Sequence, residues 1–146
     1  GDEALDAEGT KLEVVISDYA ANQGWADDTT VKHLENVLDD VITMTIAGGN
    51  FSGKYYEGTH LRVYATDTPA GTITISAAEG YKIAQVKIKT VEGTYAFLQV
   101  EGNDAEDLSN KKVDVDASSI TFNTVKNGSD GKQVRILGIE FIYTAA

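Results

Sequence analysis

Short segments in which apolar and polar side chains alternate recur along this chain, and this alternation constrains the fold more than any other feature. It is clearest in residues 42–46, 60–66 and 72–76. Alternation with a period of two places the apolar side chains on one face of an extended strand. The chain also contains 13 valines, 11 isoleucines and 15 threonines against eight leucines, and β-branched residues favour a pleated sheet. The sequence therefore predicts an all-β fold.

Turn residues separate these segments at short intervals. The stretch TPAG at residues 68–71 is typical of a tight turn, and NGSDG at residues 127–131 is typical of a hairpin connection. Changes of phase inside two long segments predict β-bulges near Ala84-Gln85 and at Gly138. About eight to ten short strands joined in this way predict an antiparallel β-sandwich with a jelly-roll-like topology.

Three segments depart from the alternating pattern. Residues 1–10 are small and acidic, so we expect a flexible leader there and a single domain over residues 11–146. Residues 17–28 are mostly polar and predict a loop. Residues 31–40 carry apolar side chains at helical spacing but end in two aspartates, which leaves a short strand or a single helical turn open.

The chain is strongly acidic. Its 12 lysines and arginines and 23 aspartates and glutamates give a net charge of −11 at pH 7. Such a chain repels phosphate backbones, so we do not expect nucleic acid as a partner. No apolar run approaches the roughly 20 residues that span a bilayer, so we expect no direct membrane insertion. The lack of cysteine excludes disulfides, thiolate metal sites and a cysteine nucleophile.

Motifs for catalysis are missing from the sequence. Neither His33 nor His60 belongs to an H-E-x-x-H pair, and there is no G-x-S-x-G motif. The alternation around His60 places it on the outward side of a strand, and we interpret it as a surface histidine. A glycosidase needs only two suitably spaced carboxylates, but nothing in the sequence singles out a pair. We therefore expect a protein that is not an enzyme and that holds no cofactor.

Aromatic residues in or beside loops are the best candidates for a ligand site. Sugar rings stack their C–H groups on aromatic faces, and polar neighbours bind the hydroxyls. The single tryptophan lies in a polar loop, two tyrosines are consecutive, and a third tyrosine shares a strand face with an arginine. We predict as ligand-binding residues Trp25, Tyr55, Tyr56, Arg62 and Tyr64. The alternatives are that Trp25 covers the end of the core and that Tyr55 or Tyr56 points inward.

Two other groups of charged residues have ordinary explanations. The segments 103–107 and 127–131 are rich in oxygen ligands of the kind that calcium accepts. A structural calcium ion is therefore an alternative to plain turn chemistry, although neither segment matches the EF-hand pattern. Lys82, Lys87 and Lys89 lie along one long segment, and we interpret them as a solvated face or as protection of an edge strand.

Several stretches together resemble a β-sandwich module that recurs in secreted and surface proteins of Bacteroides-type bacteria. The stretches are KYYEGTHLRVY (54–64), ITISAAEGYKIAQVKI (73–88), SSITF (118–122) and VRILGIEFIY (134–143). The likeness extends over residues 12–143 and is one of strands and turns, without catalytic residues. It implies an accessory domain, and the sandwich also resembles galactose-binding-like and carbohydrate-binding folds. This step is an analogy, because a fold does not determine a function.

The same resemblance implies a location. The acidic stretch 1–8 is similar to the segment that follows the lipidated cysteine of surface lipoproteins, although that cysteine is absent here. The resemblance thus implies a secreted protein or an outer-membrane lipoprotein, or part of one. Other domains of a larger surface protein are expected partners.

Three functional hypotheses follow, and the third, a small hydrolase, would require two carboxyl groups that converge in one cleft, at least one of them with an abnormal pKa. The first is a non-catalytic glycan-binding module, in which Trp25 with Tyr55 or Tyr56 stacks on the sugar and Arg62 contacts its hydroxyls. A neutral polysaccharide suits the acidic surface. The second is a structural or adhesive domain that docks or spaces other domains and binds no sugar. It predicts that Trp25, Tyr55 and Tyr56 are mostly buried, so that their removal lowers stability and not affinity.

Overall fold

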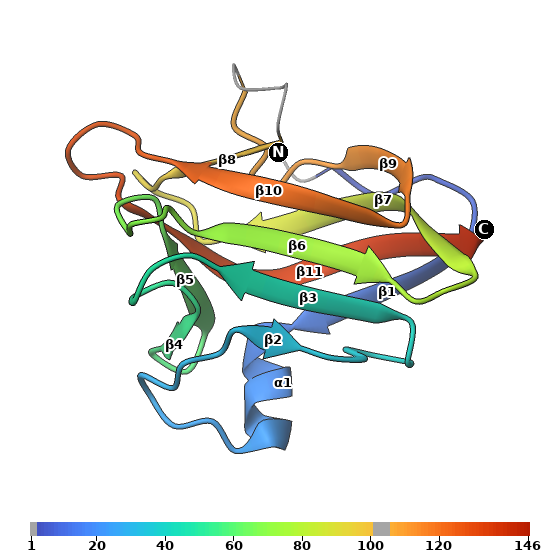
Figure 1. Ribbon diagram of the computed structural model, residues 1–146, viewed down its shortest axis with the longest axis horizontal. Coiled ribbons are helices and arrows are strands. Elements are labelled where there is room, and N and C mark those ends of the chain that lie inside the picture. The colour runs from blue at the N-terminus through green and yellow to red at the C-terminus, as the bar shows by residue number, and fades with distance from the viewer. Residues whose placement is uncertain (1–2, 101–105) are drawn as a thin grey trace.

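The computed structural model describes residues 3–100 and 106–146, which form two antiparallel sheets packed face to face (Figure 1). The first sheet has the order β4-β5-β11-β7-β9 with β1 also paired to β11, and the second has the order β2-β3-β6-β10-β8. The strands of the first sheet are β1 (Thr10–Val15), β4 (Lys54–Tyr56), β5 (His60–Tyr64), β7 (Tyr81–Thr90), β9 (Val113–Ala117) and β11 (Gln133–Ala145). Those of the second are β2 (His33–Leu34), β3 (Ile42–Ala47), β6 (Thr72–Ala77), β8 (Phe97–Val100) and β10 (Ser119–Val125). The predicted all-β antiparallel sandwich is confirmed.

The chain changes sheets at each connection from β5 to β11. The odd-numbered strands of this series belong to the first sheet and the even-numbered strands to the second. This route is jelly-roll-like, because consecutive strands face one another across the core instead of pairing side by side.

The hairpin predicted at residues 127–131 forms only as a local turn. Asn127 and Gly131 exchange backbone hydrogen bonds of 2.8 and 2.9 Å. The two flanking strands, β10 and β11, belong to different sheets, so the prediction of a paired hairpin is wrong. Turn chemistry is a local property, whereas the partner of a strand depends on which sheet buries its apolar face.

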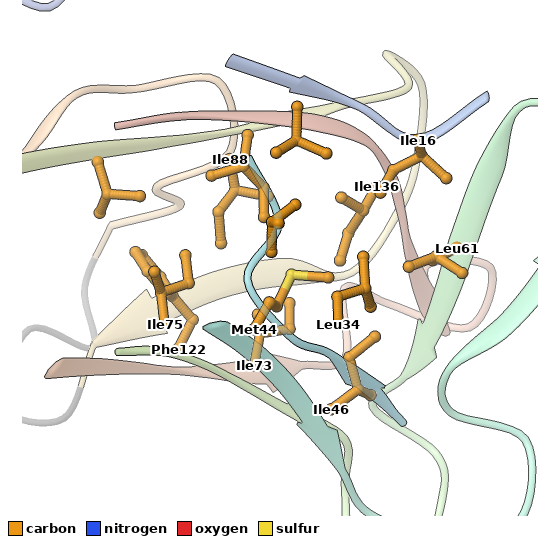
Figure 2. Close-up of a cluster of buried hydrophobic side chains, with 14 of the residues drawn as sticks. Ile16, Leu34, Met44, Ile46, Leu61, Ile73, Ile75, Ile88, Phe122 and Ile136 are labelled. Carbon is orange, nitrogen blue, oxygen red and sulfur yellow. The ribbon is translucent and has the colours of Figure 1, made fainter. Parts of the chain in front are cut away.

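Apolar side chains from both sheets meet between them and form the core (Figure 2). Side chains that are at most 1% exposed include Met44, Leu61, Ile73, Ile75, Ile88, Phe122 and Ile136. Complete burial of such a side chain contributes about 1.5–3 kcal/mol relative to its exposure. The alternating segments of the sequence thus correspond to β3, β5 and β6, with their apolar faces turned inward.

The long strand β11 organises the first sheet. β7 pairs along one edge of it, while β5 and β1 follow each other along the other edge, opposite residues 133–136 and 138–143. This arrangement brings β5, which is early in the chain, against the start of β11. The candidate site described below depends on that pairing.

Both predicted β-bulges are confirmed. The pairing of β11 with β7 shifts register between Ile136 and Gly138. The pairing of β7 with β9 shifts between Ile83 and Gln85, where the bulge near Ala84-Gln85 was expected. A change in the phase of alternation requires an extra residue, so the bulge was visible in the sequence.

The N-terminal segment packs on the outer side of the first sheet, which differs from the expected flexible leader at residues 1–10. Over residues 3–9, Leu5 is buried at 7% exposure. The Oε1 atom of Gln85 accepts hydrogen bonds of 2.9 Å from the backbone N–H groups of Asp6 and the next residue. The leader was expected to be unable to bury apolar surface, but the sheet supplies a surface against which one leucine is enough to anchor it.

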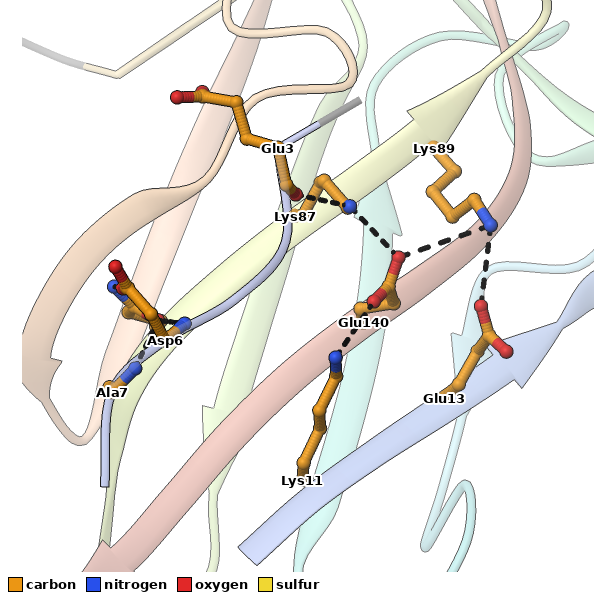
Figure 3. Close-up of polar contacts among 9 residues, drawn as sticks. Glu3, Asp6, Ala7, Lys11, Glu13, Lys87, Lys89 and Glu140 are labelled. Carbon is orange, nitrogen blue, oxygen red and sulfur yellow. Dashed lines mark hydrogen bonds and ion pairs between the residues drawn. The ribbon is translucent and has the colours of Figure 1, made fainter. Parts of the chain in front are cut away.

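The lysine row on β7 is not a solvated face throughout, and β7 is not an edge strand, because β11 and β9 flank it. Lys87 is 1% exposed, and its Nζ lies 3.0 Å from the Glu140 carboxylate and donates to the Glu3 carbonyl oxygen (Figure 3). The earlier interpretation is therefore wrong for Lys87. It holds better for Lys82 and Lys89, whose side chains are 40% and 36% exposed.

A short helix, α1 (Ile16–Gln23), occupies most of the segment that we predicted as a loop at residues 17–28, so that prediction is wrong for the helical part. Its buried residues Ile16 and Ala20 are one helical turn apart, and α1 packs against β1, β5 and β11 (Figure 1). Gly24 ends the helix in the left-handed conformation at φ 72°. The ambiguous segment 31–40 forms the two-residue strand β2.

Candidate functional site

The five residues predicted to bind a ligand lie in two different environments. Trp25 follows α1, and its ring centroid lies 5.5 Å from that of Tyr19 and 5.6 Å from that of Tyr55. Tyr55 is 6% exposed and points inward from β4, and Trp25 is half-buried against the core. These two residues pack together at the end of the sandwich covered by α1. The other three predicted residues lie on the opposite side of the first sheet.

Tyr56, Arg62 and Tyr64 point away from the core, on the outer side of β4 and β5. β11 runs beside β5 and adds two outward side chains, because Arg135 is paired directly with Arg62, and Gln133 with Tyr64. All five are partly exposed. We call the surface formed by Tyr56, Arg62, Tyr64, Gln133 and Arg135 the arginine face.

Each guanidinium of the arginine face lies over a tyrosine ring. The Cζ atom of Arg62 is 4.3 Å from the ring centroid of Tyr56, and that of Arg135 is 4.9 Å from the ring centroid of Tyr95. Such cation–π contacts contribute about 0.5–1 kcal/mol at exposed sites. Glu57 lies between the two arginines, with Oε1 3.4 Å from Arg62 Nη2 and Oε2 4.0 Å from Arg135 Nη1. The arginines are thus held in place, with a single carboxylate shared between them.

The buried side chain of His60 holds Arg62 in position through a hydrogen bond. Its Nε2 accepts a hydrogen bond of 3.0 Å from Arg62 Nε, and since arginine only donates, the proton of the neutral ring is on Nδ1, which donates to Thr59 Oγ1 at 2.7 Å. His60 is 1% exposed, so our interpretation of it as a surface histidine is wrong. Burial, together with the charges of Arg135 and Arg62, lowers the pKa of His60 to about 4. The outward side of a strand is covered here by long neighbouring side chains.

Tyr56 is locked by a second polar contact. Its hydroxyl donates a hydrogen bond to the Asp28 carboxylate, and this bond and burial raise the pKa of Tyr56 to about 12. The same bond, together with Lys54 Nζ at 3.3 Å, lowers the pKa of Asp28. The ring that carries the Arg62 guanidinium therefore has a defined position and stays protonated at neutral pH.

The remaining part of the arginine face combines an amide with exposed aromatic rings. Oriented to satisfy its neighbours, the amide of Gln133 donates to Tyr64 Oη at 2.7 Å and accepts from Arg135 Nε and Nη2 at 3.0 Å each. The Phe51 ring lies edge-on to the Tyr64 ring at 6.0 Å between centroids, and Phe51 is 58% exposed. Phe51 thus adds an exposed aromatic ring beside Tyr64 at this face.

The sequence interpretation missed Phe51, Tyr95, Gln133 and Arg135. Phe51 had a visible signal, because an aromatic residue between Asn, Ser and glycines is typical of a loop tip. Arg135 also had one, because it is the only arginine besides Arg62. Gln133 and Tyr95 carry no local signal, since their place depends on the register of β11.

A small pocket adjoins the arginine face at Arg135. It has a volume of about 210 Å³, and Tyr95, Asn110 and Asn127 contribute to its lining. Its amides hold the surrounding loops, because Asn127 Nδ2 donates to the Tyr95 carbonyl at 3.2 Å and Asn110 Oδ1 accepts from the Thr90 N–H at 2.9 Å. The pocket is therefore a hollow beside Arg135 and Tyr95 whose surrounding loops are joined by hydrogen bonds.

The acidic loops do not show a metal centre in the described part of the chain. Residues 103–105 of the segment 103–107 lie outside it, and Asp107 accepts hydrogen bonds from the Leu98 and Ser109 N–H groups at 3.0 and 3.1 Å. The segment 127–131 closes on itself as a turn. No group of three or more histidine, aspartate or glutamate side chains that could hold a metal occurs among residues 3–100 and 106–146. Within the same residues, no helix has the length and apolar character needed to cross a membrane.

The arginine face is the arrangement that best combines chemistry with exposure. Two tyrosine–arginine stacks, a bridging amide and an exposed phenylalanine lie on β4, β5 and β11 and on two neighbouring loops. Comparisons with protein-family models, with curated proteins and with solved structures found no match to the chain. Any functional assignment therefore depends on the chemistry of this surface.

Proposed function

We propose that this chain is a non-catalytic glycan-binding module and that the arginine face, together with Phe51, is its ligand surface. The observation that carries the proposal is the close combination of aromatic rings and hydrogen-bond donors on one outward surface. Phe51 and Tyr64 offer apolar ring surface, while Gln133, Arg135 and Arg62 offer polar groups. A sugar presents matching C–H faces and hydroxyls.

The rigidity of the surface supports binding. Arg62 is fixed by His60, and Tyr56 by Asp28, so these side chains lose little freedom when a ligand arrives. They project from the paired strands β4 and β5. Preorganisation of this kind increases affinity because less conformational entropy is lost on binding.

The carboxylates near the face favour binding over hydrolysis. A carboxylate glycosidase needs one acid whose pKa is raised so that it stays protonated. The pKa of Asp28 is instead lowered by Tyr56 and Lys54, and Glu57 lies between two guanidinium groups. The lowered pKa of Asp28 makes it a poor proton donor, and the Glu57 carboxylate is engaged by both arginines.

The resemblance to modules of secreted and surface proteins gives the proposal its setting. A glycan-binding accessory domain at the cell surface or in a secreted protein is consistent with that resemblance. Its partners would then be a polysaccharide and the neighbouring domains of a larger protein.

A structural or adhesive domain is the alternative, and two observations favour it. Trp25 and Tyr55 contribute to packing, as this alternative predicts. Val15 and Leu38, which are 41% and 45% exposed, border a hollow of about 330 Å³ beside α1 that Tyr19 also lines. Exposed apolar residues of this kind are typical of contact surfaces between proteins.

A glycan array followed by calorimetry tests the proposal. We expect a specific hit whose affinity falls about tenfold in Phe51→Ala and in Tyr64→Ala, because each removes an aromatic surface. The control is Tyr81→Ala, which changes an exposed tyrosine at the start of β7 that pairs with Ala145 at the far end of β11. It should bind as the unmodified chain does.

Two outcomes contradict the proposal. A blank array with folded protein overturns glycan binding and favours the structural alternative. Binding that survives in Phe51→Ala and Tyr64→Ala but is lost in Tyr81→Ala places the ligand elsewhere on the molecule.

A further inference from the structure

We propose that the glycan recognised by the arginine face carries carboxylate groups, as a hexuronic acid does, and that one carboxylate binds between Arg62 and Arg135. This inference rests on the proposed glycan-binding function and defines its ligand class. It departs from the expectation of a neutral polysaccharide, which came from the net charge of the whole chain.

The placement of the arginines is the first argument. The chain contains only two arginines among its 12 basic residues, and they face each other directly across β5 and β11. Like charges at directly opposed positions of a sheet are destabilising. Such a pair gains its compensation from an anion, and the planar guanidinium fork fits a carboxylate better than an ammonium group does.

Glu57 provides the second argument, because it already places a carboxylate at this position. Its two oxygens face one guanidinium each, at 3.4 Å from Arg62 and 4.0 Å from Arg135. Both distances exceed the 2.7–2.9 Å typical of a strong charge-assisted hydrogen bond, and the Glu57 side chain is 63% exposed. The chain's own carboxylate is therefore a loosely held occupant that a ligand can replace.

The orientation of the guanidinium groups provides the third argument. His60 accepts from the Nε of Arg62, and Gln133 accepts from Nε and Nη2 of Arg135. The contacts to Glu57 are made by the other ends, Nη2 of Arg62 and Nη1 of Arg135. Both arginines thus turn a terminal nitrogen toward the position that the Glu57 carboxylate occupies.

The local environment favours an anion in spite of the acidic chain. The Arg62 and Arg135 side chains are only 17% and 22% exposed, so their charges are screened less than those of extended surface residues. More distant carboxylates are screened beyond about 8–10 Å at physiological ionic strength. Because two guanidinium groups face the one carboxylate of Glu57, the local charge between Arg62 and Arg135 is positive.

An acidic peptide would present the same carboxylate, but the neighbouring surface favours a sugar. The Gln133 amide links Arg135 to the Tyr64 hydroxyl, and the Phe51 ring lies edge-on to the Tyr64 ring. A uronic acid joins a carboxylate to a ring with C–H faces and hydroxyls, and so matches both parts of the surface.

The test compares matched pairs of polymers by calorimetry with the full chain. Polygalacturonate, alginate and hyaluronan are each measured beside a carboxyl-reduced form, in which the uronic acid has become the neutral hexose. We expect at least one acidic polymer to bind at least about tenfold more tightly than its reduced form. An acidic peptide, poly-glutamate, is measured in parallel.

Three variants test the position of the carboxylate. Arg135→Lys and Arg62→Lys keep the charge but lose the fork, and each should weaken binding of the acidic polymer about tenfold. Glu57→Gln removes the competing carboxylate and should strengthen binding about threefold. Lys82→Gln is the control, because it removes a partly exposed cation paired with Asp116 at the other end of β7. It should leave the affinity unchanged.

The outcomes separate this inference from the proposed function. Equal binding of acidic and reduced polymers, or binding of neutral glycans alone, overturns the inference and leaves glycan binding standing. Binding of poly-glutamate without any polysaccharide overturns both. Weaker binding in Glu57→Gln also overturns the inference, because it would mean that Glu57 contacts the ligand instead of competing with it.

Discussion

Acidification should destabilise this protein through His60, a histidine that folding keeps neutral. The ring is 1% exposed, and it accepts a hydrogen bond from Arg62 Nε. Protonation would place a third positive charge beside Arg62 and Arg135 and would remove the lone pair that accepts from Arg62. The native state therefore resists the proton, whereas the unfolded chain accepts it at an ordinary pKa.

The magnitude follows from the two pKa values of His60. Burial and the two arginines lower its pKa from 6.5 to about 4. Between these values the unfolded chain binds a proton that the native chain does not, so the free energy of unfolding falls as the pH falls. The contribution is complete above pH 6.5, and it is lost at up to about 1.4 kcal/mol per pH unit down to about pH 4. Because solvent partly screens the arginines, we expect a total loss of about 2–3 kcal/mol.

Urea unfolding at a series of pH values from about 7 to about 4.5 measures this loss. His60→Gln keeps an oxygen that can accept from Arg62 but cannot take up a proton near neutral pH, so its stability should depend less on pH over this range. His33→Gln, which changes the exposed histidine of the chain, is the control and should follow the unmodified protein. Parallel pH profiles for His60→Gln and the unmodified protein would refute the reasoning.

Three further predictions concern packing. Trp25→Ala should lower the free energy of unfolding by about 2–4 kcal/mol, because the half-buried ring packs between two tyrosines; lost glycan affinity with unchanged stability would contradict this assignment. Lys87→Met should lower the free energy of unfolding in urea by about 3 kcal/mol, because the buried Glu140 carboxylate loses its nearest cation. The double variant Lys87→Met/Glu140→Leu should recover most of this loss, because no buried charge is then left without its partner. A double variant as unstable as the single one would show that the pair itself is not the cause. Gly138→Ala should lower the free energy of unfolding by about 1–3 kcal/mol, because the added Cβ atom would lie 2.4 Å from the Val14 carbonyl oxygen. A neutral effect in thermal unfolding would show that β1 shifts freely.

Local patterns in the sequence were sufficient for the strand faces and the bulges. The alternation in residues 60–66 assigned Leu61 and Val63 to the core, because the side chains of any extended strand alternate. The phase change at Gly138 predicted a bulge for the same reason. The helix α1 was missed because only Ile16 and Ala20 are buried on it, which is too short a pattern to distinguish from a polar loop.

The candidate site was predictable only in part. Alternation placed Arg62 and Tyr64 on the outward side of their strand, but it left open which of Tyr55 and Tyr56 points inward, and the structure turns Tyr56 outward. Arg135 was not, because 72 residues separate it from Arg62 in the sequence and only the pairing of β5 with β11 brings the two together. Trp25 was assigned to the ligand, but the position of α1 against the sandwich places its ring beside Tyr55.

The sequence by itself determined that this chain forms strands, which side of each strand is apolar and where two strands change phase, because these are properties of neighbouring residues. Only the tertiary structure decided which strands pair and which outward residues are covered. Lys87 and His60 both lie on the outward side of a strand, yet each is 1% exposed, because an N-terminal segment covers Lys87, whereas Arg62 on the same strand and Arg135 on β11 lie close to His60. Burial on an outer face depends on contacts between residues distant in the sequence, and the alternation of a single strand carries no information about them.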